Sequence, residues 1–283
     1  MSDVADNRGT GTVCSGDVDI YFRRFGAKNR TPILIVHGLS YFSYDWIGPA
    51  SALAHDREVV AIDMRGFGES GWSAARDYKL ETLSGDVLRV MDAMNWPRAL
   101  VLGHSFGGRV ALATAGWHPD RVAGLVLVDF APDIAAAGRR ATAERIGRQP
   151  DVFASVDEAM IYHEEDNTPA IRARYEAFLK PVNGGVQLRR DLHYRDNFKK
   201  ALESGQSAPV PAFLWPMLTE LKVPALVIRG SESNMFDAAT LDKVRQVAPK
   251  AAAIELRGGH HLAGDNPDGL VQAITRFLDH AHL

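Results

Sequence analysis

Short apolar runs, each ended by a turn residue, constrain the fold of this chain more than any other feature of its sequence. They lie at 33–36, 59–62, 99–102, 125–128, 225–228 and 252–256. A strand needs an almost continuous apolar sequence when helices cover both faces of its sheet, as in parallel sheets. The stretch 18–25 alternates instead, which is typical of an edge strand with one exposed face. The runs therefore predict a mostly parallel sheet.

Helical patterns fill most of the gaps between these runs. Apolar residues recur at helical spacing over 80–94 and 270–278, and an Ala-rich run spans 106–117. Strands that alternate with helices predict an α/β fold with right-handed crossovers. The alternation of strands and helices breaks once, between residues 128 and 223. A loop of that length without regular structure is improbable. We therefore expect a helical cap at 132–216 on a core formed by 1–131 and 217–283.

Composition and charge exclude several classes of protein. Of the 283 residues, 46% are apolar and 24% charged, as in ordinary globular proteins, and the formal net charge is −3. There is no basic excess to bind nucleic acid or an anionic membrane, and no run approaches the ~18 apolar residues of a membrane span. The single Cys14 rules out an intramolecular disulfide and fits a reducing, cytoplasmic location. Residues 1–11 are polar, which is typical of a frayed tail and not of a secretion signal.

The motif that carries chemistry is Gly103-His104-Ser105-Phe106-Gly107, between the run at 99–102 and the Ala-rich helix. This is G-x-S-x-G in a strand–turn–helix context. The serine sits on a strained, tight turn, and a Cβ two residues before or after it would meet a neighbouring strand or helix. The following helix aims its N-terminal amides at the serine. The alternative is a glycine-rich turn with a capping serine.

Three further motifs lie in a fixed order around this one. They are His37-Gly38-Leu39-Ser40, the turn Asp63-Met64-Arg65-Gly66-Phe67-Gly68-Glu69-Ser70, and Gly259-His260 followed by Pro267. With these motifs, nearly the whole chain resembles the α/β-hydrolase superfamily. The resemblance implies a mostly parallel eight-stranded sheet, a helical cap inserted after the sixth strand, and a serine esterase-like site.

Two of these motifs also allow other interpretations. Residues 66–71 match the dinucleotide fingerprint G-x-G-x-x-G, but three residues separate the strand from the first glycine and no apolar helix opens at Gly71. We therefore expect a structural turn there. The resemblance places His37 as a support for the oxyanion loop, and we prefer that role to a catalytic one.

A catalytic serine needs a base, because a free hydroxyl is almost never ionised at neutral pH. The resemblance gives His260 this role, and His261 is the competitor. A metal site on the paired histidines is disfavoured, because adjacent side chains in an extended loop point in different directions and no cysteine or carboxylate cluster completes a coordination shell. We expect no metal and no cofactor.

The residue that orients the base is less defined by the sequence. Most members of the superfamily carry an aspartate where Ser233 stands, and a serine cannot act as an anionic partner. Asp129 follows the run at 125–128, and some members use that position. Its separation from Ser105 is one helix plus one strand, so both lie at the same sheet edge. Glu232 and Asp237 remain alternatives for the acid.

The resemblance also implies the oxyanion donors and suggests walls for a substrate pocket. The backbone N–H groups of Leu39 and Phe106 are expected to bind the oxyanion. We expect Leu39, Phe106, Phe130 and Trp215 to line an apolar pocket. No convergent basic cluster is visible in the sequence, which disfavours a highly anionic substrate.

Together these features predict a serine hydrolase that cleaves carboxylic esters of small to medium apolar substrates through an acyl-enzyme with a Ser105–His260–Asp129 triad. C–C bond, lactone or amide hydrolysis, or perhydrolysis, are alternatives on the same residues. A non-catalytic ligand receptor with this fold is a further alternative. The expected partner is a small-molecule ester or related carbonyl compound, with neither nucleic acid nor membrane, and the chain is expected to be a monomer or homodimer.

Overall fold

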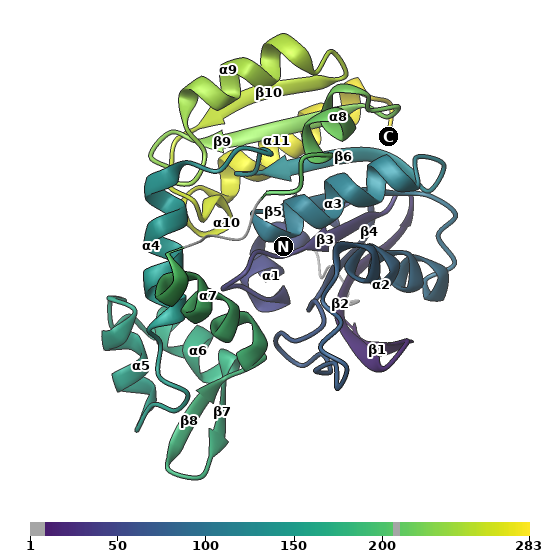
Figure 1. Cartoon of the computed structure of the whole chain (residues 1–283). Helices are drawn as coiled ribbons and strands as arrows, with labels where there is room; N and C mark the ends of the chain where they lie inside the picture. Colours follow the sequence, from purple (N-terminus) through teal and green to yellow (C-terminus); the bar gives the residue numbers. More distant parts are fainter. Residues whose placement is uncertain (1–8, 206–209) are drawn as a thin grey trace.

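A computed structural model describes residues 9–205 and 210–283, and a single large sheet organises them (Figure 1). The eight strands follow the order β1-β2-β4-β3-β5-β6-β9-β10. Their bounds are β1 (Gly9–Ser15), β2 (Val18–Asn29), β3 (Ile33–Val36), β4 (Arg57–Ile62), β5 (Ala99–His104), β6 (Val122–Val128), β9 (Ala225–Gly230) and β10 (Ala251–Leu256). Neighbours from β4 to β10 are parallel, whereas β1 pairs antiparallel with β2, and β2 with β4. The predicted mostly parallel eight-stranded sheet is confirmed.

The N-terminal edge of the sheet differs from the expectation. The stretch 18–25 is not an edge strand, because β1 pairs with β2 along its whole length and forms the edge. Residues 9–11 of the predicted tail belong to β1, and residues 1–8 lie outside the described residues. The sequence of β1, GTGTVCS, has little apolar pattern of its own. Its hydrogen-bonded ladder with β2 therefore defines this strand.

Two layers of helices cover the sheet. One face packs against α2 (Leu80–Ala93), α3 (Phe106–Trp117), α8 (Leu214–Thr219) and α9 (Ala238–Val247). The other packs against α1 (Ile47–Leu53), α10 (Leu262–Asp265) and α11 (Pro267–His280). Successive residues of one strand enter opposite layers, as Val60 and Ala61 do. Burial on both faces is the reason that the strands are continuously apolar.

The segment between β6 and β9 forms a cap at one end of the molecule (Figure 1). It contains α4 (Ala136–Gly147), α5 (Val156–Tyr162), α6 (Pro169–Phe178), α7 (Leu192–Ser204) and a hairpin of β7 (Leu179–Val182) with β8 (Gly185–Leu188). The cap was expected to be helical, so the hairpin differs from the prediction. Its two-residue loop is Asn183-Gly184, with Gly184 at φ +88°, and Asn-Gly between strand-like runs is a strong hairpin signal.

The cap has an apolar cluster of its own, which includes Phe153, Met160, Tyr175 and Phe178. Phe42, from the core loop after β3, completes this cluster and stacks on Phe178 with ring centroids 4.8 Å apart. Within α8, Leu214 and Leu218 belong to the core layer instead. The cap boundary at 132–216 stays a prediction, and α8 crosses its second end.

The turn at 66–71 joins core and cap. No helix begins at Gly71, as expected, and the next helix, α2, begins at Leu80. The Gly68 amide donates to the Arg189 carbonyl at 2.7 Å, and a Cβ at Gly68 would lie 2.1 Å from Asp63 Oδ2. Across the described residues, every helix is too short or too polar to pass through a lipid bilayer.

Candidate active site

The carboxyl ends of the parallel strands bring the predicted site residues to one edge of the sheet. Ser105 follows β5 directly, Asp129 follows β6 directly, and Leu39 lies three residues after β3. His260 comes from the loop after β10 and reaches back over the same edge. Ligands of open α/β sheets bind outside this edge, so the arrangement marks a candidate site.

Ser105 occupies a strained backbone position. Its φ and ψ are +52° and −117°, outside the region that L-residues favour. Two close approaches require the flanking glycines. A Cβ at Gly103 would lie 2.2 Å from the Gly107 carbonyl oxygen, and one at Gly107 would lie 2.3 Å from the carbonyl oxygens of Val36 and His37. The turn therefore exposes the Ser105 hydroxyl above the sheet edge.

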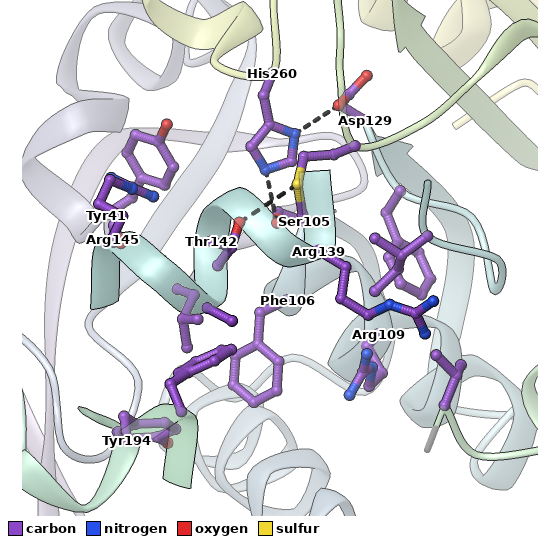
Figure 2. Close-up of a pocket in the computed structure, with 18 of the residues that line it drawn as sticks. Tyr41, Ser105, Phe106, Arg109, Asp129, Arg139, Thr142, Arg145, Tyr194 and His260 are labelled. Carbon is purple, nitrogen blue, oxygen red and sulfur yellow. Dashed lines mark hydrogen bonds and ion pairs between the residues drawn. The ribbon is translucent and has the colours of Figure 1, made fainter. Parts of the chain in front are cut away.

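His260 lies between Ser105 and Asp129 (Figure 2). Its Nδ1 is 2.6 Å from Asp129 Oδ2, and its Nε2 is 2.8 Å from Ser105 Oγ. A carboxylate oxygen only accepts hydrogen bonds, so Nδ1 carries the proton and donates it. In the neutral ring, Nε2 then accepts from the Ser105 hydroxyl. This orientation leaves His260 ready to take the serine proton.

Asp129 is buried and fully hydrogen-bonded, with 2% of its surface exposed. Oδ1 accepts from the Gly230 amide at 2.8 Å, and Oδ2 accepts from Ser233 Oγ at 2.5 Å as well as from His260. Ser233, where most relatives were expected to carry the acid, therefore holds the carboxylate that comes from the neighbouring strand.

The alternative acids lie elsewhere. Glu232 is exposed, and Asp237 caps α9 by accepting from the Thr240 amide at 2.7 Å. Within the described parts of the chain, Asp129 is the carboxylate in contact with His260.

The other histidines near the site have separate partners. His37 Nε2 accepts from the Met64 amide at 2.9 Å and Nδ1 donates to the Gly38 carbonyl at 2.7 Å, which ties the loop after β3 to the end of β4. His261 stacks on Tyr41 with ring centroids 4.4 Å apart. Burial lowers the pKa of both imidazoles, so both are neutral at pH 7.

Leu39 and Phe106 flank Ser105 in the lining of the adjacent cavity. Phe106 is the first residue of α3, and the first amides of a helix have no intrahelical acceptor. From the cap, Arg174 Nη2 donates to the Ser40 carbonyl at 3.1 Å, and its Nε donates to Asp45 Oδ1 at 2.5 Å. The cap therefore fixes the loop that carries Leu39.

A cavity of about 270 Å³ opens beside Ser105. Its wall is largely apolar, and the side chains that contribute include Leu39, Phe106, Phe130, Ile134, Tyr194 and Met235. This volume is at the small end of ligand pockets. The cavity lies between the core edge and helices α4 and α7 of the cap.

Trp215 does not line this cavity, which corrects the expectation. Its indole Nε1 donates to Asp133 Oδ1 at 2.8 Å, and Lys243 Nζ lies 3.7 Å from the ring centroid. Helix α8 packs against α3, and the Trp215 side chain is partly buried against the core layer, with its indole between these charged groups.

The expectation that no basic cluster converges is also corrected. Arg109, Arg139 and Arg145 line the cavity. They come from α3 and α4, which are far apart in sequence, so only the folded cap brings them together. Arg109 had one available signal, because a residue four positions after Ser105 lies one helical turn along the same face.

In residues 9–205 and 210–283, no three His, Cys, Asp or Glu side chains are placed to hold a metal ion. The arrangement of hydroxyl, imidazole and carboxylate can instead activate a serine for attack on a carbonyl carbon.

Comparison with known proteins gives one family and several relatives. The family model described as alpha/beta hydrolase fold matches residues 31–154. The chain is 27% identical over 252 residues to 2-(acetamidomethylene)succinate hydrolase of Mesorhizobium japonicum, covering 87% of each chain. It is 26% identical over 258 residues to esterase YbfF of Escherichia coli, covering 89% of this chain and 94% of the relative.

A solved structure has the same fold along its whole length. The crystal structure of E-2-(acetamidomethylene)succinate hydrolase superposes with a TM-score of 0.82 at 24% identity, covering 96% of this chain and all of that one. The match to the family model lies on β3 to β6, where the G-x-S-x-G turn is found. From its fold, its motifs and these relatives, the chain belongs to the α/β-hydrolase superfamily.

Proposed function

We propose that this α/β hydrolase is a serine esterase that cleaves small to medium carboxylic esters through an acyl-enzyme. The observation that supports this most is the continuous contact from Ser105 through His260 to Asp129 beside a largely apolar cavity. One of the relatives is named as an esterase, which further supports the proposal.

In the proposed reaction, Ser105 Oγ attacks the ester carbonyl carbon while His260 Nε2 takes its proton. The backbone amides of Leu39 and Phe106 stabilise the oxyanion that forms. His260 then gives the proton to the leaving alcohol, and the acyl group stays on Ser105. A water molecule, deprotonated by His260, attacks the acyl carbonyl and releases the acid. Asp129 keeps the imidazole in the required tautomer and stabilises its charged form.

Amide hydrolysis is the second candidate on the same residues. One relative has a name that contains an acetamido group, which favours this alternative among those on the same triad. The two candidates differ only in the leaving group, because His260 would protonate an amine instead of an alcohol.

A fluorophosphonate probe and two substrates, p-nitrophenyl acetate and p-nitrophenyl butyrate, test the proposal. We expect the probe to label Ser105 and both esters to be hydrolysed. Ser105→Ala and His260→Ala should each lower kcat by ~10⁴-fold or more, because members of a triad act as a unit.

The matched control is His261→Ala, since His261 stacks on Tyr41 and has no contact with Ser105. Labelling of wild type with turnover of N-acetyl amides but no ester would favour the amide alternative. Labelling without turnover of either class would favour a ligand receptor and contradict the proposal.

A further inference from the structure

Three guanidinium groups surround the cavity next to Ser105. Besides Asp129, which is bound to His260, Gly230 and Ser233, the described lining contains no acidic side chain. The cavity is thus positively charged in a protein whose formal net charge is −3. A local excess of one sign inside a low-dielectric cleft attracts ligands of the other sign.

Of the three arginines, Arg109 is the one that lies on a helix of the core, close to Ser105. It lies on α3, and its amide donates to the Ser105 carbonyl at 3.3 Å, so it is one turn, or ~5.4 Å of rise, from the serine. Its guanidinium carbon lies 5.8 Å from the centroid of the Phe106 ring, in the wall of the cavity.

Arg109 has no anionic partner among the described residues. Its Nε is buried and makes no hydrogen bond within this part of the chain. Burial lowers the pKa of the guanidinium, and it still carries its charge at pH 7. Arg109 as a whole is partly buried. A charge held largely out of water without an anionic partner is unfavourable, so a bound anion would stabilise it.

Arg139 reaches the same cavity from the cap. It is partly buried on α4, and Figure 2 shows its guanidinium on the same side of the view as that of Arg109. Its neighbour Arg140 behaves differently, since it is 81% exposed in its side chain and pairs with Glu144. Arg145, also on α4, is exposed and lies beside Tyr41 on the other side of the view.

We propose that Arg109 and Arg139 form a carboxylate-binding subsite, so that the preferred substrate is a short ester or amide that carries a carboxylate group. The two guanidiniums present forked donors that match the planar geometry of a carboxylate. The cavity of about 270 Å³ admits only a small molecule. Because Arg109 is one helical turn from Ser105, the carboxylate lies a few bonds from the scissile carbonyl. Arg145 adds positive charge at the cap side of the cavity and assists capture of the anion.

The kinetic test of this inference rests on the proposed function, because it measures ester hydrolysis. Two ester pairs place the charge on either side of the scissile bond. Monoethyl succinate is compared with ethyl pentanoate, and 3-acetoxypropanoate with butyl acetate. We expect at least one acid to exceed its neutral partner in kcat/KM by about tenfold or more.

Arg109→Gln and Arg139→Gln should each lower kcat/KM for the preferred acid by about ten- to a hundredfold, and lower kcat/KM for its neutral partner by much less, so that the preference for the acid falls. The matched control is Arg140→Gln, which should keep the preference of the wild type. Equal losses on acid and neutral esters would contradict the subsite, as would a wild type that prefers the neutral esters. If the wild type hydrolysed none of the esters or amides, the proposed function itself would be rejected.

A binding measurement is independent of turnover. Thermal shifts of the full-length Ser105→Ala variant are recorded with succinate, with succinamide as its neutral analogue, and with inorganic phosphate. We expect succinate to stabilise this protein, succinamide to have no effect, and the addition of Arg109→Gln to abolish the succinate shift while circular dichroism remains that of a folded protein. Stabilisation by phosphate but not by succinate would overturn the carboxylate assignment, and no shift with either anion would overturn the subsite.

Discussion

At the scale of single residues, the identity of the acid is the most direct test of the site. Asp129→Asn keeps the size of the side chain but removes its charge, and its amide can present a donor to His260 Nδ1. The imidazole would then be held in the wrong tautomer. We expect kcat for p-nitrophenyl acetate to fall by ~10⁴-fold with little change in unfolding temperature.

Glu232→Gln is the matched control, because Glu232 is an exposed carboxylate on the neighbouring loop. It should retain activity within about twofold. A Glu232→Gln variant that loses activity while Asp129→Asn keeps it would reverse the assignment of the acid.

Spacing in the sequence was informative for some residues and not for others. Ser105 and Asp129 were placed because each directly follows an apolar strand, and the parallel sheet aligns the ends of such strands. The arginines at the cavity were not predicted as a cluster, because the cap determines where Arg139 lies. Trp215 was misplaced for a related reason, since aromatic character alone does not say which side of α8 faces a cavity.

At the scale of elements, a buried ion pair joins the cap to the loop after β3. The side chains of Arg174 and Asp45 are 17% and 2% exposed, and Arg174 also binds the Ser40 carbonyl. Arg174→Ala leaves the Asp45 carboxylate buried without its partner. We expect a loss of about 3–5 kcal/mol in the free energy of unfolding, measured by urea denaturation.

Arg172→Ala provides the comparison on the same helix, because its pair with Asp157 is much more exposed. This control should cost less than about 1 kcal/mol. Equal costs for the two variants would mean that the Arg174 pair contributes no more than a surface pair.

The core elements were predictable and the cap elements less so. Strands β3, β5, β6 and β9 are buried along their whole length because helices cover both of their faces. In contrast, β1 has almost no apolar pattern, and the β7–β8 hairpin has only Asn183-Gly184 to mark it. Such elements owe their structure to backbone pairing, which composition and periodicity do not reveal.

At the scale of the whole molecule, several histidines are buried in their neutral form. Burial lowers the pKa of His37 and moves that of His104 well below its ordinary value. In the cap, burial and nearby arginines lower the pKa of His163 to about 4. The core and the cap therefore share one sensitivity to acid, although they form separate apolar clusters.

The sign of this sensitivity follows from the unfolded chain, where a histidine has a pKa of ~6.5. Above pH 6.5 both states are neutral and His163 contributes no pH dependence. Between pH 6.5 and about 4 the unfolded state binds a proton that the folded state does not, so stability falls as the pH falls. We expect His163 alone to lower the free energy of unfolding by about 1.4 kcal/mol between pH 7.5 and 5.5.

Urea denaturation of His163→Gln at these two pH values isolates this contribution. The variant should lose less stability on acidification than wild type, by about 1.4 kcal/mol, whatever its stability at pH 7.5. If His163→Gln responded to acid as strongly as wild type, His163 would be protonated in the folded cap, and the acid sensitivity would reside in the core histidines alone.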